Sequence, residues 1–333
     1  MDQFVPYFED FAVGDNLSDV PAVTITSGHV AIHQAIFGDR LKMALDHPLS
    51  LAVTGHDQAL VSSSLVCNIA IGLSTIPSQR VMGNLFYRGL VLLEPVFVGD
   101  TLSVTTKVVG LKQNKIRAGR AASGMVALEI EVKNQRRSTV MHFWRCPMIP
   151  CRDESIDTGK VDDFSFMPEK IEASALFAAV PDWDYDKYRE MTDGSYFRDL
   201  VVGTTLNIEA KDTVTLAPEL VRMTLNLAMT HTDAGQSVYG KRLVYGGHTI
   251  TMAAAQLLRV MPNVLSVLAW YKCDHLAPVF EEDVLHSRVT IDNLSEAKGA
   301  GVVNLSVQTY AVRPDSETGN VQVLDWKLAV LSA

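Results

Sequence analysis

The chain contains the segment PVFVGDTL at residues 95–102 and the similar segment PVFEEDVL at residues 278–285, an offset of 183 (278 minus 95). A second pair of segments precedes this one in each half: YFEDFAVG at residues 7–14 and YFRDLVVG at residues 196–203, with an offset of 189 (196 minus 7). Two matches in the same order with nearly equal offsets indicate a duplicated unit. A repeat this long is the size of a domain, which argues against solenoids and propellers because their periods are shorter.

The duplication divides the chain into three parts. Residues 1–151 are the predicted first copy, residues 152–195 a connector with a short helix, and residues 196–333 the second copy. Each copy opens with short strands and a helical stretch of mixed polarity, which in the second copy covers residues 219–229.

One long apolar helix is then predicted in each copy, at residues 58–73 and 249–260, and a proline that cannot continue a helix follows both. Strands rich in Val, Leu, Thr and aromatic residues come next, at 84–93, 101–111, 125–133 and 140–148, and again at 265–271, 284–294, 301–313 and 321–331. One helix with about five antiparallel strands is an α+β unit in which the sheet wraps the helix. Two such units can pair their sheets edge to edge, which removes an exposed edge from each.

Composition excludes several classes of protein. The 333 residues are 47% hydrophobic, which is enough to build a core in each half. A net charge of -9 leaves no basic field for nucleic acid or for an anionic membrane. The 4 cysteines have no CxxC spacing, so neither a zinc site nor a disulfide framework is indicated. No secretory signal or long apolar run is present, and we expect a cytoplasmic protein without nucleic acid or membrane partners.

The repeated pattern resembles the hotdog fold, and more narrowly the MaoC-like family of (R)-specific enoyl-CoA hydratases and dehydratases in its double-hotdog form. The resemblance covers nearly the whole chain and rests on residues 7–15, residues 95–102 and the segment RLVYGGH at 242–248. Within the family the chain is most similar to the mesaconyl-CoA hydratase-like subgroup. The resemblance implies a lyase that reversibly adds water to a 2-enoyl-CoA thioester, with a short-chain or branched dicarboxyl acyl group. It implies no metal and no cofactor apart from the coenzyme A of the substrate.

In the family's hydration motif a His stands five residues after an Asp and a second Asp two residues later. The matching positions in the second copy are Asn226, His231 and Asp233, so an amide replaces the first acid. In the first copy Asp39 keeps the register, but Ala44 stands where the His should be. The second copy is therefore the predicted active half, and the first copy is predicted to be degenerate, with a candidate second site at Asp39 and His47.

Hydration needs a base for the water, an acid for Cα and donors for the charge that develops on the thioester oxygen. A His with an ordinary pKa of about 6.5 can act as base and then as acid, so His231 is the catalytic candidate. Asp233 would orient its ring, and Asn226 would hold the water. Gly246 and Gly247 precede an apolar helix, where free N–H groups favour negative charge, and are the predicted oxyanion site.

Further substrate-binding candidates surround these glycines. His248 falls in the first turn of the helix, where it would line the pocket or donate to the thioester. Arg242 is the basic candidate for the phosphates of coenzyme A, together with Arg222 and Lys241.

Each candidate also has a structural explanation. His231 could bridge backbone groups, Asp233 could cap a turn, and the two glycines could mark a tight turn alone. The segment Cys273-Asp274-His275 resembles a nucleophile cluster, but successive strand residues face opposite sides of a sheet. Cys273 and His275 would then share one face without Asp274, so we favour a structural role for them.

Two other functions stay open at this point. Thioester hydrolysis on the same fold would use Asp39 or Asp233 to activate water at the carbonyl carbon. A non-catalytic acyl-CoA-binding partner subunit is the third interpretation, because the motif is incomplete in both copies. A homo-oligomer such as a dimer is compatible with all three.

Overall fold

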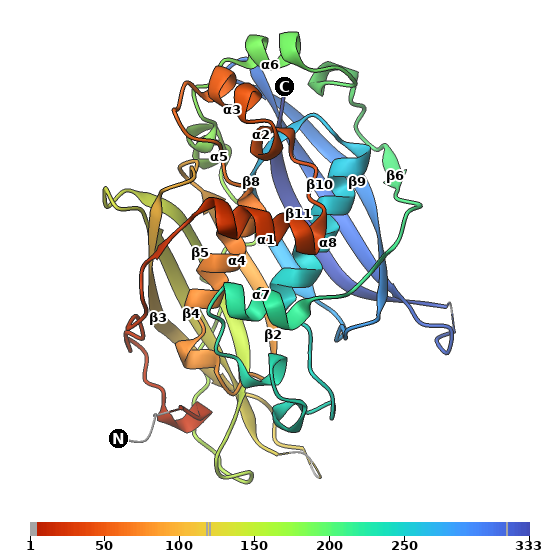
Figure 1. Ribbon diagram of the computed structural model, residues 1–333. Helices are drawn as coiled ribbons and strands as arrows, with labels where there is room; N and C mark the ends of the chain where they lie inside the picture. Colours follow the sequence, from red (N-terminus) through yellow and green to blue (C-terminus); the bar gives the residue numbers. More distant parts are fainter. Residues whose placement is uncertain (1–4, 118, 120, 318) are drawn as a thin grey trace.

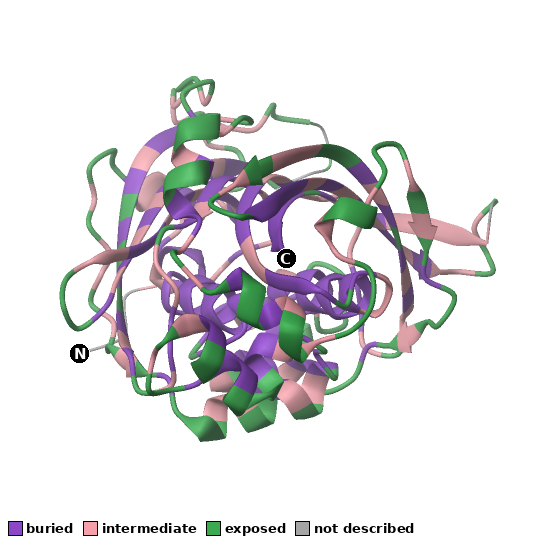
Figure 2. Ribbon diagram, turned by 90° about the horizontal axis from the view of Figure 1, so that it is seen from above, coloured by how far each residue is buried: buried purple, intermediate pink, exposed green. Residues whose placement is uncertain are grey.

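One continuous antiparallel sheet dominates the computed structural model, which describes residues 5–117, 119, 121–317 and 319–333. The described residues form 11 strands in the order β1-β3-β4-β5-β2-β8-β11-β10-β9-β6, with β7 paired to β9. The sheet curves around the helices, and its ends bend toward one another (Figures 1 and 2). The strands are β1 Val23–Thr24, β2 Gly83–Leu92, β3 Thr101–Gln113, β4 Ser123–Lys133, β5 Thr139–Pro150, β6 Thr205–Asn207, β7 Asp212–Thr213, β8 Val264–His275, β9 Val284–Ala297, β10 Ala300–Val312 and β11 Asn320–Ser332.

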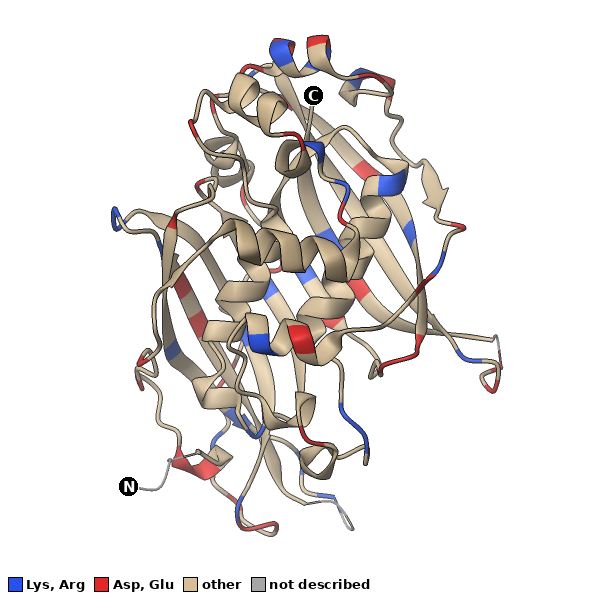
Figure 3. Ribbon diagram, in the orientation of Figure 1, with Lys and Arg blue, Asp and Glu red and all other residues tan. Residues whose placement is uncertain are grey.

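Two buried helices, α4 and α8, lie side by side in the concave face of the sheet, one from each copy (Figure 1). Both carry almost no charge, whereas charged residues are scattered over the strands and loops without forming a basic face (Figure 3). The helices are α1 Ser27–Phe37, α2 Lys42–Leu45, α3 His47–Thr54, α4 Ser63–Leu73, α5 Ala173–Ala179, α6 Tyr185–Met191, α7 Ala217–Met223 and α8 Gly246–Val260. The predicted α+β class, with one long helix wrapped by a sheet in each copy, is confirmed.

The two copies join through the central strands β2 and β8. Arg88 pairs with Lys272 and Leu90 with Trp270 in an antiparallel register, which is the edge-to-edge pairing predicted from the sequence. Residues separated by the repeat offset of 183 meet along this seam. Asn68 donates a 2.8 Å hydrogen bond to Thr251 (251 minus 68 is 183), and the rings of Tyr87 and Trp270 lie 5.8 Å apart (270 minus 87 is 183).

Equivalent residues of two copies can touch only near the axis that relates them. The contacts between Asn68 and Thr251, and between Tyr87 and Trp270, therefore mark a pseudo-twofold axis through the centre of the molecule. Any pocket off this axis has a counterpart built from the equivalent residues of the other copy.

The helix predicted over residues 219–229 is shorter than expected. It ends at Met223, and Leu225 adopts a left-handed backbone with a φ of 54°, which an α-helix cannot include. The chain then turns back and forms a single 3₁₀ turn at Met229–His231. This break carries the motif residues out of a helix and into a loop.

Gly72 of α4 lets that loop pack against the first copy. A Cβ at Gly72 would lie 2.2 Å from the carbonyl oxygen of Thr224, so only glycine allows this approach. The N–H of Leu227 donates to Thr75 Oγ1 at 2.9 Å, and the N–H of Met229 donates to the Gln79 carbonyl at 2.8 Å. A loop of the second copy is thereby fixed on the first.

No helix in the described part of the chain is long and apolar enough to cross a lipid bilayer. Among the same residues, no three His, Cys, Asp or Glu side chains gather so that they could hold a metal ion.

Candidate active site

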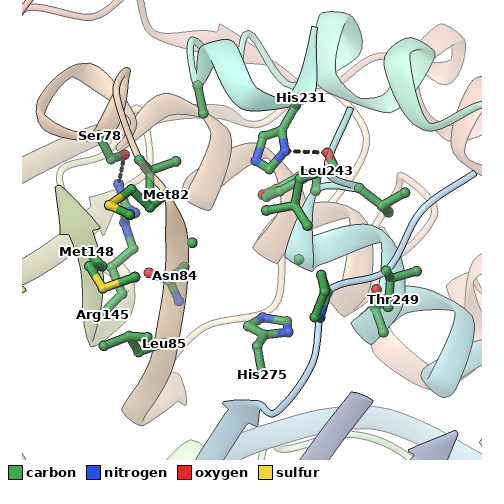
Figure 4. A pocket seen from close by; sticks show the side chains of 18 of the residues that line it. Ser78, Met82, Asn84, Leu85, Arg145, Met148, His231, Leu243, Thr249 and His275 are labelled. Carbon is green, nitrogen blue, oxygen red and sulfur yellow. Dashed lines mark hydrogen bonds between the residues drawn. The ribbon is translucent and has the colours of Figure 1, made fainter. Parts of the chain in front are cut away.

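A cavity of about 240 Å³ opens where the His231 loop crosses the sheet, and both copies line it. The first copy contributes the end of α4, the start of β2 and two residues of β5. The second copy contributes the loop after α7, the N-terminus of α8 and the end of β8 (Figure 4). Polar lining residues are Thr75, Ser78, Asn84, Tyr87, Arg145, Asn226, His231, Tyr239, Tyr245, Thr249 and His275.

The structure places His231 in the wall of this cavity, with only 9% of the residue exposed. Its Nδ1 lies 2.7 Å from the carbonyl oxygen of Leu243, and a carbonyl oxygen can only accept. Nδ1 therefore carries the proton, and Nε2 keeps a free lone pair. Burial lowers the pKa of His231 to about 4, although the bond to Leu243 opposes the shift. The ring is neutral at pH 7 and can accept a proton.

Asn226 lines the same cavity as His231 and is 7% exposed. Its Oδ1 accepts a 2.9 Å hydrogen bond from the N–H of Ala228, which holds the loop in shape. Its Nδ2 has no hydrogen-bond partner in the described part of the chain. That amide is free to donate to a water molecule or to a ligand.

The expected role of Asp233 needs correction. The side chain is exposed, does not line the cavity, and accepts a 2.8 Å hydrogen bond from the N–H of Gly235 as the cap of a short 3₁₀ turn. The Leu243 carbonyl orients His231 in its place. This occurs because the 3₁₀ turn ends at His231, so Asp233 projects from the following turn toward solvent.

The two predicted oxyanion glycines have different surroundings. Gly246 is the first residue of α8 and lines the cavity, where its N–H is one of the donors that a helix leaves unpaired. Gly247 does not line the cavity. A Cβ there would lie 2.2 Å from Asn68 Oδ1, so this glycine serves the close packing of α8 on α4.

His248 and Arg242 do not contact the cavity. His248 points to the other side of α8, toward α1, where its ring lies 4.8 Å from that of Phe37 and burial lowers its pKa to about 3. Arg242 is exposed and forms an ion pair with Glu281. The predicted phosphate partners Arg222 and Lys241 likewise lie outside the lining. Arg222 Nη1 lies 3.6 Å from Glu219 Oε1, and Lys241 Nζ lies 3.7 Å from the centre of the Phe280 ring.

The candidate second site at Asp39 and His47 is not formed. Asp39 is buried and accepts hydrogen bonds from the N–H of Leu41 at 3.0 Å and from Ser62 Oγ at 2.6 Å. His47 is exposed at the start of α3. The cavity beside Asp39 measures about 20 Å³, against about 240 Å³ for the cavity lined by His231, so it is too small for a substrate.

The structure adds His275, which sequence reasoning assigned to the fold. It stands at the end of β8, lines the cavity across from His231, and burial lowers its pKa to about 4. Its ring packs on Gly246, where a Cβ would lie 2.5 Å from Nε2. Cys273 is fully buried away from the cavity lining, and burial raises its pKa well above the usual value, so it is not a nucleophile.

Arg145 is the second residue that sequence reasoning missed. It lies on β5, is 2% exposed, and lines the cavity. The repeat offers a signal for both residues. With the offset of 183, Arg145 corresponds to Leu328 (328 minus 145) and His275 to Leu92 (275 minus 92), while the motif pairs His231 with Ala44. These three polar residues therefore occur once, because the residue equivalent to each of them is apolar.

No family model matches the chain. Two curated proteins do. The chain is 30% identical over 295 residues to a β-methylmalyl-CoA dehydratase of Chloroflexus aurantiacus, covering 84% of this chain and 80% of that protein. It is 27% identical over 321 residues to a mesaconyl-CoA hydratase of Cereibacter sphaeroides, covering 93% of this chain and 90% of the relative.

Solved structures agree with this comparison. A conserved hypothetical protein of Mycobacterium tuberculosis, described as having a double hotdog fold, is 39% identical with a TM-score of 0.90 over 98% of both chains. A putative MaoC domain dehydratase of Chloroflexus aurantiacus is 25% identical with a TM-score of 0.87, covering 100% of this chain and 99% of that one.

Proposed function

Because the chain belongs to the MaoC-like double-hotdog family of hydratases and dehydratases, we propose that it is a lyase that reversibly adds water to a 2-enoyl-CoA thioester. The observation that carries this proposal is the free Nε2 of a neutral His231 in the wall of the cavity that Gly246, the first residue of α8, also lines with an N–H that the helix leaves unpaired. A base and an oxyanion donor on one cavity are what the addition requires.

In the proposed mechanism, Nε2 of His231 removes a proton from a water molecule that Asn226 Nδ2 holds. The water oxygen bonds to Cβ as the Cα–Cβ double bond opens, and the negative charge moves to the thioester oxygen. The N–H of Gly246, aided by the α8 dipole, stabilises that charge. The imidazolium of His231 then returns its proton to Cα, so the water is added as H and OH and the base is regenerated.

The low pKa of His231 suits this cycle. A histidine that is neutral in the free protein is ready to act as a base at pH 7. The imidazolium forms only while the substrate carries the enolate charge, and that charge favours the protonated ring. The proposal uses no cofactor apart from the coenzyme A of the substrate.

Thioester hydrolysis receives less support. The mechanism considered for it needs a carboxylate at the carbonyl carbon, but no Asp or Glu is among the described residues that line the cavity. Asp39 is held by Ser62 and Leu41 in the other copy, and Asp233 faces solvent.

One assay separates the candidate functions. The protein is mixed with crotonyl-CoA or mesaconyl-CoA while the absorbance of the conjugated enoyl thioester and the free thiol are both followed. Hydration removes the conjugation without releasing thiol, hydrolysis releases thiol, and a non-catalytic binder changes neither signal.

His231→Gln should lower kcat roughly 10²- to 10⁴-fold, the usual contribution of general acid–base catalysis. His47→Gln is the matched control, because His47 is exposed and remote from the cavity, and its activity should equal that of the wild type. Turnover near the wild-type level in a folded His231→Gln variant would remove the mechanism.

The compartment and assembly also remain proposals. All 4 cysteines are buried and free, which suits a reducing cytosol. A homo-oligomer stays a prediction, which light scattering coupled to size-exclusion chromatography measures directly.

A further inference from the structure

A small cavity in the first copy repeats the walls of the His231 cavity. It measures about 30 Å³, and 14 residues line it. Eleven of them stand at the offset of 183 from residues that line the His231 cavity; Ser63 corresponds to Gly246, for example, and Ser266 to Gly83. This first-copy cavity is therefore the counterpart that the pseudo-twofold axis requires.

The cavity beside Asp39 belongs to the same counterpart. Ser63 and Val267 line both it and the first-copy cavity. Asp39 corresponds in the motif to Asn226, which lines the His231 cavity. The first copy thus holds two remnants of about 30 Å³ and about 20 Å³ where the second copy holds one cavity of about 240 Å³.

The connector closes the first-copy cavity. The other three residues that line it are Ala179, Pro181 and Trp183, which belong to the connector and not to the repeat. They come from the end of α5 and the turn after it, and α5 lies against β2 and β8 (Figure 1). Residues 179–183 therefore take up space that stays open in the second copy.

Both copies hold the connector in this position. The N–H of Asp184 donates to the carbonyl oxygen of Val53 in α3 at 2.9 Å. Lys298, in the turn between β9 and β10, donates from Nζ to the carbonyl oxygen of Val180, which is fully enclosed. The side chain of Trp183 packs against the buried core. These contacts fix the segment in the cavity.

A simple crossing from one copy to the other is the competing explanation for this path. A crossing alone does not explain why the surface beneath it has the walls of a ligand cavity. Val66 and Leu92 stand where the second copy has Thr249 and His275, and both are buried. Without the connector they would line an apolar hollow, which is the usual form of a small-molecule site.

The lining also indicates the kind of ligand that this hollow would take. Val66 and Leu92 make its walls apolar. Glu94 adds a carboxylate, whose Oε2 accepts a 3.1 Å hydrogen bond from Asn134 Nδ2. A negative charge there repels an anionic group, so an uncharged acyl chain fits the hollow best.

We propose that the first copy retains a second binding site for the acyl arm of a thioester, and that residues 179–183 of the connector occupy it. Ala44 and Leu92 stand at the positions equivalent to His231 and His275, so a thioester bound there would be held without reaction. The connector keeps substrate out of this unproductive site. The choice of a thioester as the ligand rests on the proposed function, whereas occupation by the connector does not.

The test removes the occupant and counts the bound ligands. Butyryl-CoA is the probe, because it is saturated and cannot be hydrated. Calorimetry should show a single butyryl-CoA per wild-type chain and a second, weaker one in Trp183→Gly, where loss of the ring opens the cavity. Trp144→Gly is the matched control, because Trp144 lies on β5 outside both cavities, and it should bind a single ligand.

A double variant locates the second ligand. Trp183→Gly combined with Val66→Phe places a ring in the same space from the opposite wall. This variant should lose the second ligand and keep the first. A second ligand that persists after this refilling would overturn the assignment.

The remaining outcomes separate this site from the proposed function. A single ligand in a folded Trp183→Gly would overturn the second site. A ligand in Trp183→Gly with none in the wild type would support the second site and count against the proposed function. Absence of ligand from both proteins would overturn the second site, and the crotonyl-CoA assay on the wild type then decides the proposed function by itself. Should Trp183→Gly fail to fold by circular dichroism, Trp183→Leu, which leaves a smaller opening, takes its place.

Discussion

The neutral state of His231 in the folded protein makes stability depend on pH in a way that one substitution can isolate. The unfolded chain binds a proton at this histidine near pH 6.5, whereas the folded protein does so only near pH 4. Between these values the unfolded state holds more protons, so the stabilisation present above pH 6.5 is lost as the pH falls toward 4. From pH 6.5 to pH 5 the difference is 1.5 units at about 1.36 kcal/mol each, or about 2 kcal/mol.

His231→Gln removes the titrating ring and keeps a side chain that can donate to Leu243. The free energy of unfolding, measured in urea at pH 7 and pH 5, should fall by about 2 kcal/mol less in His231→Gln than in the wild type. His47→Gln is the control, because its side chain is exposed, and should follow the wild type. The pKa of His231 is measured directly by NMR, from the pH dependence of its Cε1–H chemical shift. The resonance is assigned by its absence from the spectrum of His231→Gln.

A midpoint near pH 6.5 for that resonance would refute the argument, since a ring with an ordinary pKa is not held neutral by burial. Equal pH dependence of stability in wild type and His231→Gln would refute it independently. Three further buried histidines with lowered pKa values add to the acid sensitivity of both proteins: His33, His248 and His275. The charge of His231 contributes to the lowered pKa of His275, so His231→Gln also relieves part of that shift.

Two other predictions concern residues around the cavity. Gly246→Ala should lower kcat/KM at least 10-fold, because the new Cβ would lie 2.5 Å from His275 Nε2 and must displace that ring by about half an ångström or more; Gly83→Ala, with nothing within 4 Å, is the control. Equal activity of the two variants would show that the position of His275 does not matter. Asp233→Ala should cost at most about 1 kcal/mol of unfolding free energy and leave turnover unchanged, because the side chain only caps an exposed turn. A large loss of kcat in Asp233→Ala would restore this carboxylate to the mechanism.

The fold was predictable because the duplication is preserved in segments that make turns and strand starts. Asp100 and Asp283 each accept hydrogen bonds from the N–H three residues earlier, of Phe97 and Phe280, at 2.9 Å in both copies. These turns depend on residues only three positions apart, so both copies keep the same residue types there and the repeat can be recognised in the sequence. Element boundaries were less exact: α4 begins at Ser63 and not at residue 58, because the preceding residues are extended and Leu60 bridges to Phe97.

The site was predictable only in part. His231 follows a local spacing, and the structure brings it to a cavity together with Asn226 and Gly246. Arg145 and His275 have no local motif, and their approach to His231 depends on how β5 pairs with β2 and how β2 pairs with β8. Registers between strands far apart in sequence are not readable from a single chain. Comparison of each residue with its partner at an offset of 183 is the one signal that could have found them, because a charged or titratable side chain stands opposite a leucine in both cases.

The seam between β2 and β8 lets two unequal walls share one binding chamber. In a dimer of identical subunits every substitution appears in both subunits. The two symmetry-related cavities therefore cannot differ from each other. In a tandem chain the two copies can change independently. One copy can then supply the residue for proton transfer while the other supplies the opposite wall of the same cavity. The counterpart beside Asp39 measures only about 20 Å³, so the copy that lost its cavity contributes packed structure beneath the one that remains.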